Sequence, residues 1–258
     1  MRQFRPADMR EIYDLRAQSI DYFYTDRKEE IELWEDIIDD YGKEILHLMC
    51  GTGELSLGLA EKGFDVVGLD LTQAMLYEAN DKLEYRNIDN IEFVKDDARH
   101  FNLNRRFDFI FASNGDFHHF TERKEIDSVL AKSYAHLKNG GAIALELFEL
   151  PERDYHRKEK EFDPLRAPPQ GIDMWKTNEV SYYKENKIME VREKLHVEDE
   201  ENDETTNAEY EIFLKLFSEE EIKEILLDNG FDNIKFIKDY SVPTHIKDPD
   251  TWIVTAEK

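Results

Sequence analysis

The stretch Ile45-Leu-His-Leu-Met-Cys-Gly-Thr-Gly53 decides the fold of this chain. Its first six residues are suited to a buried strand, and Gly51 and Gly53 then allow the backbone to turn tightly. The next segment, Glu54 to Lys62, has the pattern of a helix. A helix that starts at such a turn points its amide hydrogens at any ligand lying against the turn. The stretch therefore predicts a strand–turn–helix unit with a binding site at the turn.

The alternation of strands and helices continues along the chain. The other expected strands of this region are Phe64–Leu69, Ile91–Val94, Phe107–Phe111, Ala142–Phe148, Ile234–Tyr240 and Thr251–Ala256. The other expected helices are Asp8–Ile20, Asp26–Asp39, Thr72–Tyr85, Glu122–Leu137 and Ser218–Asn229. Such alternation favours an α/β fold, in which a doubly wound and mostly parallel sheet carries helices on both faces.

The pattern changes between residues 151 and 217. Pro151–Gly171 is charged and rich in proline, which predicts a loop. Three strands with two-residue alternation are expected to follow, at Met174–Tyr183, Ile188–Val197 and Glu209–Phe217. We therefore expect one α/β domain, residues 1–150 and 218–258, interrupted by an antiparallel β insert. The insert is expected to be a lid over a ligand pocket, a dimerisation sheet, or both.

Composition limits the classes of function. The chain has 258 residues, of which 40% are hydrophobic and 36% charged, a profile of a globular protein. Its 34 Lys and Arg residues against 59 Asp and Glu give a net charge of −25, which argues against nucleic acid and anionic membranes as partners. A single cysteine excludes an intramolecular disulfide, and no segment resembles a signal peptide or a membrane span. The expected location is the cytoplasm.

An acidic residue ends the strand after the glycine turn. Asp70 lies 17 positions beyond Gly53, where a carboxylate can accept hydrogen bonds from both hydroxyls of a ribose. A dinucleotide oxidoreductase would use the same acid. However, Ser56 stands where that fingerprint requires glycine, and Tyr134-Ala-His-Leu-Lys138 lies too near in sequence to serve as its catalytic pair.

Longer motifs extend the pattern. Leu48-Met-Cys-Gly-Thr-Gly-Glu-Leu55 and Gly63-Phe-Asp-Val-Val-Gly-Leu-Asp-Leu-Thr-Gln-Ala-Met-Leu76 resemble the first two motifs of class I S-adenosylmethionine-dependent methyltransferases. Phe93–Ala98, Phe107–Asn114 and Leu137–Leu145 resemble the next three. The insert and the segment Leu216–Phe231 resemble small-molecule members, including sugar N-methyltransferases and enzymes like glycine N-methyltransferase.

The resemblance implies a Rossmann-like sheet of seven strands, S-adenosylmethionine as cofactor and S-adenosylhomocysteine as product. The cofactor-binding residues that it implies are Tyr13, Tyr24, Cys50, Gly51, Gly53, Asp70, Leu71, Met75, Asp97, Ala98, Ala112 and Ser113. Two positions depart from the family, which usually has an acid at His47 and a glycine at Met49. The first change removes a negative charge near the methionine end of the cofactor, and the second reduces the freedom of the backbone.

The loop after the strand at Phe107–Phe111 is where the methyl group and the acceptor are expected to meet. His119 and His118 are the candidates for a general base, because imidazole titrates near neutral pH. Asp116 and Glu146 are candidates for holding a cationic acceptor. The scattered histidines show no spacing typical of a metal site, so we expect no metal.

The sequence therefore predicts methyl transfer to a small-molecule acceptor, with nitrogen slightly preferred over oxygen. The alternative is a protein that binds the cofactor or its product without catalysis, as a sensor or an inactive subunit.

Overall fold

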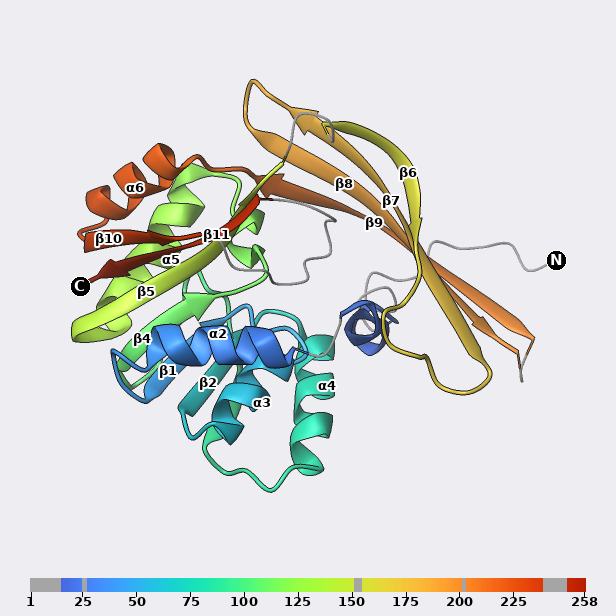
Figure 1. The fold of residues 1–258 in the computed structure, drawn as a ribbon, viewed down its shortest axis with the longest axis horizontal. Coiled ribbons are helices and arrows are strands. Elements are labelled where there is room, and N and C mark those ends of the chain that lie inside the picture. The colour runs from blue at the N-terminus through green and yellow to red at the C-terminus, as the bar shows by residue number, and fades with distance from the viewer. Residues whose placement is uncertain (1–14, 25–26, 151–154, 201–202, 239–249) are drawn as a thin grey trace.

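A computed structural model of the chain describes residues 15–24, 27–150, 155–200, 203–238 and 250–258. The described residues form two sheets, a seven-stranded sheet flanked by helices (sheet A) and a four-stranded antiparallel sheet (sheet B). Sheet B extends away from one end of sheet A, with the N-terminal helical turn between them (Figure 1).

Sheet A has the strand order β10-β11-β5-β4-β1-β2-β3. Its strands are β1 (Glu44–Leu48), β2 (Asp65–Asp70), β3 (Ile91–Lys95), β4 (Phe107–Ala112), β5 (Leu137–Glu149), β10 (Asp232–Ile237) and β11 (Asp250–Glu257). Neighbouring strands in the row β5-β4-β1-β2-β3 pair in parallel. In contrast, β11 pairs antiparallel with both β5 and β10. The predicted α/β fold with a mostly parallel sheet of seven strands is confirmed.

Helices cover both faces of sheet A because each presents an apolar stripe to it. On one face, α2 (Lys28–Ile38) and α3 (Glu54–Glu61) pack side chains such as Trp34 and Leu59 against the sheet. On the other face, α5 (Arg123–His136) and α6 (Glu219–Asp228) do so with Leu130 and Leu226. A further helix, α4 (Gln73–Glu84), lies beside β2 and β3.

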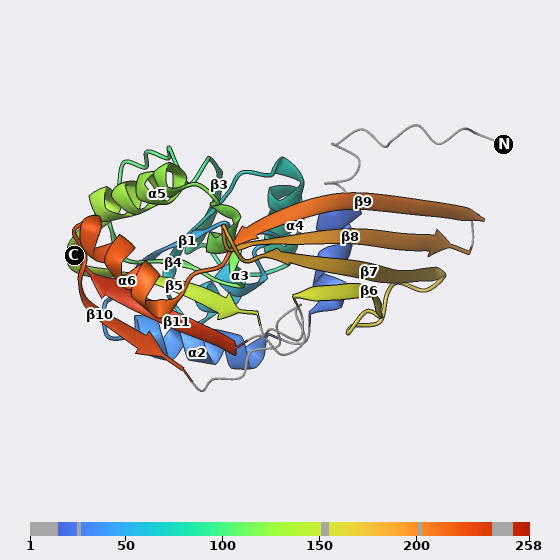
Figure 2. The ribbon, with the colours of Figure 1, turned by 90° about the horizontal axis from the view of Figure 1, so that it is seen from above.

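Sheet B contains one strand more than the sequence predicts. Its strands are β6 (His156–Phe162), β7 (Ile172–Tyr183), β8 (Ile188–Asp199) and β9 (Glu204–Lys215), paired in that order. The prediction of an unbroken loop at 151–171 is therefore wrong, because β6 pairs along the edge of β7 despite its many charges. An edge strand can carry such charges, since they discourage pairing with other chains. Figure 2 shows the four strands running outward as one layer.

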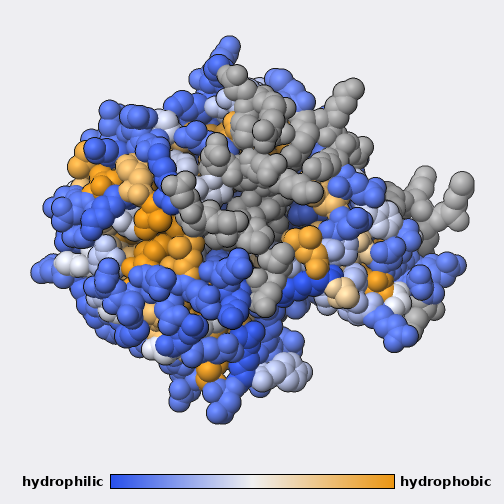
Figure 3. All heavy atoms as spheres, in the orientation of Figure 1, coloured by the Kyte–Doolittle hydropathy of each residue, from blue (hydrophilic) through white to orange (hydrophobic). Residues whose placement is uncertain are grey.

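The N-terminal segment lies between the two sheets. The expected helix at 8–20 falls largely outside the described residues; those that are described continue through a short helix, η1 (Ile20–Phe23). Phe23 is buried against the inner face of sheet B, where it packs in one cluster with Met174 and Leu195. Hydrophilic side chains cover most of the face seen in Figure 3, in agreement with the charged composition.

Replacement of Gly53 by alanine should destabilise the fold by about 2–4 kcal/mol. Gly53 precedes α3 with φ +77°, and a Cβ there would lie 2.6 Å from the ring of Phe93 and 2.9 Å from Ala79. Strain and overpacking each cost about 1–3 kcal/mol. Urea unfolding measures the loss. Gly63→Ala is the control, because Gly63 has φ +91° but a Cβ added to it would meet no atom within 4 Å, so only the backbone strain remains.

Candidate cofactor and acceptor site

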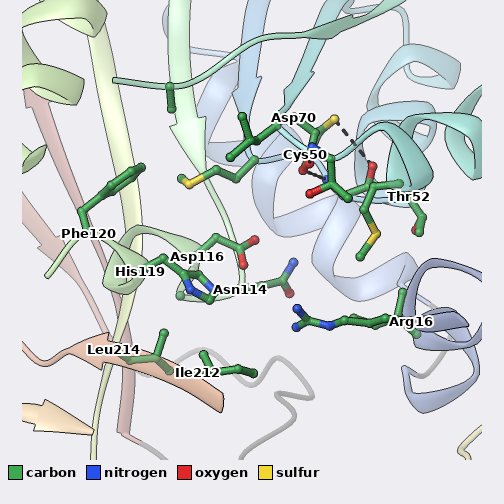
Figure 4. Close-up of a pocket in the computed structure, with 18 of the residues that line it drawn as sticks. Arg16, Cys50, Thr52, Asp70, Asn114, Asp116, His119, Phe120, Ile212 and Leu214 are labelled. Carbon is green, nitrogen blue, oxygen red and sulfur yellow. Dashed lines mark hydrogen bonds between the residues drawn. The ribbon is translucent and has the colours of Figure 1, made fainter. Parts of the chain in front are cut away.

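A cavity of about 450 Å³ lies where the carboxyl ends of β1, β2 and β4 face sheet B. This is the edge at which open α/β sheets bind ligands. The turn after β1 forms one side, and η2 (Asp116–His119), the short helix after β4, forms another. The N-terminal segment and the inner face of sheet B complete the wall. In Figure 4 the side chains of Asp70, Asp116, Asn114 and Arg16 point toward the middle of this space.

The turn after β1 is tied to the end of β2 through Asp70. One carboxylate oxygen of Asp70 accepts the N–H of Gly51 at 2.9 Å, and the other accepts the N–H of Thr72 at 2.8 Å. Burial raises the pKa of Asp70, while these two amide groups act to lower it. Each oxygen keeps a further lone pair that a ribose hydroxyl can use.

The backbone of this turn adopts left-handed conformations. Gly51 has φ +56°, and no atom lies within 4 Å of the place where a Cβ would stand. Met49 has φ +54°, a conformation that costs a non-glycine residue about 1 kcal/mol or more. Met49 thus adopts, with strain, a left-handed conformation that a glycine would adopt freely.

The part of the cavity next to Asp70 is lined by both apolar and charged side chains. Leu71 is 58% exposed although it lines the cavity, and Met75 and Ala98 lie in the same wall. Next to them Arg99 holds the carboxylate of Asp97, with Nε at 2.9 Å from one oxygen and Nη2 at 2.7 Å from the other. This ion pair and the backbone N–H of Arg99 keep the pKa of Asp97 low. A planar base stacked on Leu71 would cover its exposed apolar surface.

The N-terminal segment is fastened over the turn by Asp21. Its carboxylate accepts the hydroxyl of Thr52 at 2.7 Å and pairs with Lys82 of α4, whose ammonium also donates to the carbonyl oxygen of Thr52 at 2.9 Å. Tyr24, which the resemblance implies as a cofactor-binding residue, lines the cavity, and the guanidinium of Arg27 lies 4.9 Å from its ring centre.

Arg16 extends into the cavity from the same segment. Its Nε is buried and has no hydrogen-bond partner among the described residues, and its guanidinium lies 5.0 Å from the ring of Tyr210. Figure 4 shows the guanidinium directed toward Asn114. A buried donor of this kind is suited to a ligand carboxylate.

Sheet B supplies a wall that is polar at one end and apolar at the other. Lys176 and Glu193 are both buried, with Nζ and Oε2 3.3 Å apart, and the hydroxyl of Tyr210 donates to Glu193. Ile212 and Leu214 line the part of the cavity next to η2. These residues were not predicted from the sequence, because nothing in the alternating strand pattern indicates which ligand a face will meet.

We call residues 113–120 the acceptor loop. Near its start, Asn114 is held by hydrogen bonds from both its backbone and its side chain. Asn114 has φ +56°, its N–H donates to Glu146 at 2.7 Å, and its side-chain oxygen accepts from Arg27 at 2.9 Å. A strained conformation held by several hydrogen bonds is frequent in functional loops.

Two acids beside the acceptor loop have raised pKa values. Burial, together with the charge of Asp70, raises the pKa of Asp116 to about 7. Burial and the charge of Glu30 raise the pKa of Glu146. Asp116 lines the cavity, so a carboxylate that exchanges a proton near neutral pH faces the ligand space.

The two histidines of this loop have different surroundings. The Nδ1 of His118 lies 2.5 Å from the carbonyl oxygen of Lys215, and its Nε2 accepts the N–H of Phe148 at 3.0 Å. Both ring nitrogens are therefore engaged by the backbone, which leaves no lone pair for a substrate proton. His119 instead lines the cavity with its ring open to it, and the surrounding protein and Arg16 lower its pKa to about 4.

The remaining predicted residues are placed as follows. Cys50 and Gly51 line the cavity, whereas Gly53 shapes the turn as the residue before α3. Ala112 and Ser113 are buried at the end of β4 behind the wall. Tyr13 lies outside the described residues. Within the described ranges no three His, Cys, Asp or Glu side chains are grouped so that they could hold a metal ion.

These residues fit S-adenosylmethionine. Asp70 offers acceptors to a ribose, Leu71 and Met75 an apolar seat to an adenine, and Arg16 an unsatisfied donor to a carboxylate. The open space at Gly51 allows a ligand to approach the backbone.

Residues 45–141 match the family described as methyltransferase domain. Cypemycin N-terminal methyltransferase from Streptomyces sp. is 36% identical over 106 residues, which cover 41% of this chain and 42% of that protein. Glycine/sarcosine N-methyltransferase from Aphanothece halophytica is 25% identical over 224 residues, which cover 84% of this chain and 76% of that protein. Several matches thus span less than half the length of the curated relative.

Solved structures show the same fold as the described residues. The sugar N-methyltransferase KedS8 from Streptoalloteichus sp. superposes with a TM-score of 0.77 at 18% identity, covering 100% of this chain and 98% of that one. At such identity the likeness concerns the fold. No described helix is both long and apolar enough to cross a membrane. Residues 45–141 match the methyltransferase domain family, and the described chain has the fold of S-adenosylmethionine-dependent methyltransferases.

Proposed function

We propose that the protein transfers the methyl group of S-adenosylmethionine to an amine of a small-molecule acceptor. The observation that carries this proposal is the single cavity wall that unites Asp70 and the turn after β1 with Asp116 and the acceptor loop. The choice of nitrogen is supported by similar proteins that are named cypemycin N-terminal methyltransferase, glycine/sarcosine N-methyltransferase and sugar N-methyltransferase.

Charge also favours an amine acceptor. Asp116 lines the cavity, and its carboxylate is ionised once the pH exceeds its raised pKa of about 7. An alkylammonium ion is attracted by carboxylates in a site of low polarity, whereas a neutral alcohol gains little from them. The polar part of sheet B offers further hydrogen bonds to a hydroxylated or zwitterionic acceptor.

The sulfonium of the bound cofactor supplies an activated methyl group and a good leaving group. The protein has to hold the acceptor in line, exclude water and remove one proton from the acceptor nitrogen. Asp116 is suited to take that proton, because its pKa lies near neutrality. His119 remains a neutral hydrogen-bond partner at pH 7, given its lowered pKa. The N-terminal segment and sheet B together close the cavity, so that sheet B serves as a lid.

Calorimetric titration with S-adenosylmethionine and S-adenosylhomocysteine tests the cofactor. We expect micromolar dissociation constants for both. Methyl-labelled cofactor would then be incubated with a panel of glycine, sarcosine, amino sugars, short peptides and phenols. Label transfer to an amine supports the proposal, and transfer only to phenols argues for oxygen instead. Binding without transfer to any member of a broad panel favours a non-catalytic cofactor-binding protein, and absence of binding refutes both.

Pairing of two copies through sheet B remains a separate proposal. On the face of sheet B that points away from the cavity, Trp175 stacks on His196, with 4.9 Å between ring centres. Sedimentation equilibrium of the wild type and of Trp175→Glu would test it, since a dimer built on this face should dissociate in the variant.

A further inference from the structure

A continuous chain of hydrogen bonds runs behind the acceptor loop. It begins at Arg27, whose Nη2 donates to the side-chain oxygen of Asn114 at 2.9 Å. The side-chain nitrogen of Asn114 donates to the hydroxyl of Ser113 at 3.2 Å. That hydroxyl lies 3.0 Å from Nε2 of His47. Nδ1 of His47 lies 2.7 Å from the hydroxyl of Ser56 in α3.

The chemistry of Arg27 sets the direction of the bonds from Arg27 to Ser113. A guanidinium only donates, so the oxygen of Asn114 must face Arg27 and the nitrogen must face Ser113. The hydroxyl of Ser113 then has its own hydrogen free for Nε2 of His47. When the Ser113 hydroxyl donates to Nε2, that nitrogen accepts, and Nδ1 carries the proton that is donated to Ser56.

His47 is well suited to this place. It is 2% exposed and its ring stacks on Phe111, with 4.2 Å between ring centres. Burial, and to a lesser degree Arg27, lowers its pKa to about 3, so the ring is neutral at working pH. A protonated ring would donate at both nitrogens and could not accept from Ser113.

This chain of hydrogen bonds also accounts for two residues, His47 and Ser56, that differ from the motifs discussed in the sequence analysis. An acid is usual at position 47 in the family that this sequence resembles, and Ser56 breaks the dinucleotide fingerprint. A carboxylate at position 47 would add a buried negative charge, and the nearby Arg27 already pairs with Glu30. A neutral imidazole bonds both Ser113 and Ser56, donating at one nitrogen and accepting at the other, without adding a charge.

We propose that His47 is a positioning residue that, as the Nδ1–H tautomer, fixes the acceptor loop through Ser113 and Asn114. The loop carries Asp116 and His119, so its placement determines where the acceptor amine meets its base. This inference rests on the proposed function only for its catalytic consequence. The placement of the loop can be measured without any acceptor.

Hydrogen exchange of the peptide that contains residues 114–120 tests the role of His47. In His47→Leu, which keeps apolar bulk but removes both hydrogen bonds, we expect exchange to accelerate about tenfold, the factor that corresponds to one ordinary hydrogen bond. His47→Gln should restore slow exchange, because its oxygen can accept from Ser113 and its nitrogen can donate to Ser56.

The matched control is His136→Leu. His136 is buried, and its ring bonds the carbonyl oxygen of Lys132 at 2.8 Å and the N–H of Leu103 at 3.1 Å, outside this chain of bonds. The variant His136→Leu should leave the rate of hydrogen exchange in residues 114–120 unchanged. Equal acceleration in both leucine variants, or none in His47→Leu, overturns the proposal.

Two further measurements separate this inference from the proposed function. Nitrogen-15 spectra of the wild type should show His47 neutral with its proton on Nδ1, and a proton on Nε2 overturns the inference even if no variant folds. Titration with S-adenosylhomocysteine should give His47→Leu a dissociation constant within about threefold of the wild type. A much larger loss assigns His47 to cofactor binding and also overturns the inference, whereas failure of the wild type to bind refutes only the proposed function.

Discussion

Replacing Asp70 with asparagine should raise the dissociation constant of S-adenosylhomocysteine about 100-fold or more. The carboxylate accepts the amide hydrogens of Gly51 and Thr72, and it is the acceptor placed for the ribose. Asparagine turns an NH₂ group toward one of these donors and removes the negative charge. Hydrogen bonds to charged groups contribute about 1.5–3 kcal/mol each, so the loss of two gives at least this factor.

Asp65→Asn is the matched control, because Asp65 begins the same strand that Asp70 ends. Its carboxylate is half exposed and pairs with Arg105 at 3.0 Å, far from the cavity. Calorimetry should show an unchanged dissociation constant. An unchanged constant in Asp70→Asn would instead show that the cavity does not bind a ribose at this carboxylate.

Acidification should weaken cofactor binding for the same reason. The ribose hydroxyls need the ionised carboxylate, and burial holds the pKa of Asp70 above that of an ordinary aspartate. As the pH falls, affinity should therefore decline before ordinary aspartates become protonated. The decline should be absent in Asp70→Asn, whose weak binding no longer depends on this proton.

The parts of the fold that follow from local rules could be predicted from the sequence. The buried strand at β1, the two glycines and the acid at the end of β2 combine a hydrophobic run, a turn and a strand end, and each is visible within a few residues. β6 could not be predicted in this way. Its charged sequence becomes a strand only because β7 offers it an edge, and pairing between distant segments leaves little local signal.

The same distinction separates the predicted from the unpredicted parts of the site. The sequence indicated Asp70, Leu71 and Met75 through the motif that contains them. It did not indicate Arg16 or Lys176, which reach the cavity from a helical segment and from sheet B. It could not distinguish His118 from His119 either, since only the carbonyl of Lys215 and the N–H of Phe148 reveal that the first ring is fully engaged.

Replacing Asp116 with asparagine should lower kcat for an amine acceptor by about 100-fold or more. Removal of a general base costs about 10²- to 10⁴-fold, and Asp116 is the cavity-lining acid whose pKa, about 7, matches a base at neutral pH. Asparagine has nearly the same size and keeps a polar side chain in the wall. The affinity for S-adenosylhomocysteine should therefore change little, which calorimetry can verify.

The pH profile gives a second, independent readout of Asp116. The wild type needs the ionised carboxylate, so kcat/KM should rise with pH through about 7, the value to which burial and Asp70 bring the pKa of this group. In Asp116→Asn that limb should vanish. Activity should then recover only at the higher pH at which the acceptor amine loses its proton in solution.

His119→Gln distinguishes the two candidate bases. With its pKa lowered to about 4, His119 is already neutral at pH 7 and is a weaker proton acceptor than the Asp116 carboxylate. Its replacement should cost about tenfold or less and should leave the limb near pH 7 in place. If His119→Gln instead abolishes turnover while Asp116→Asn retains it, the proton passes to the imidazole. The raised pKa of Asp116 would then reflect only its burial near Asp70, a cost that the fold tolerates beside a ligand site.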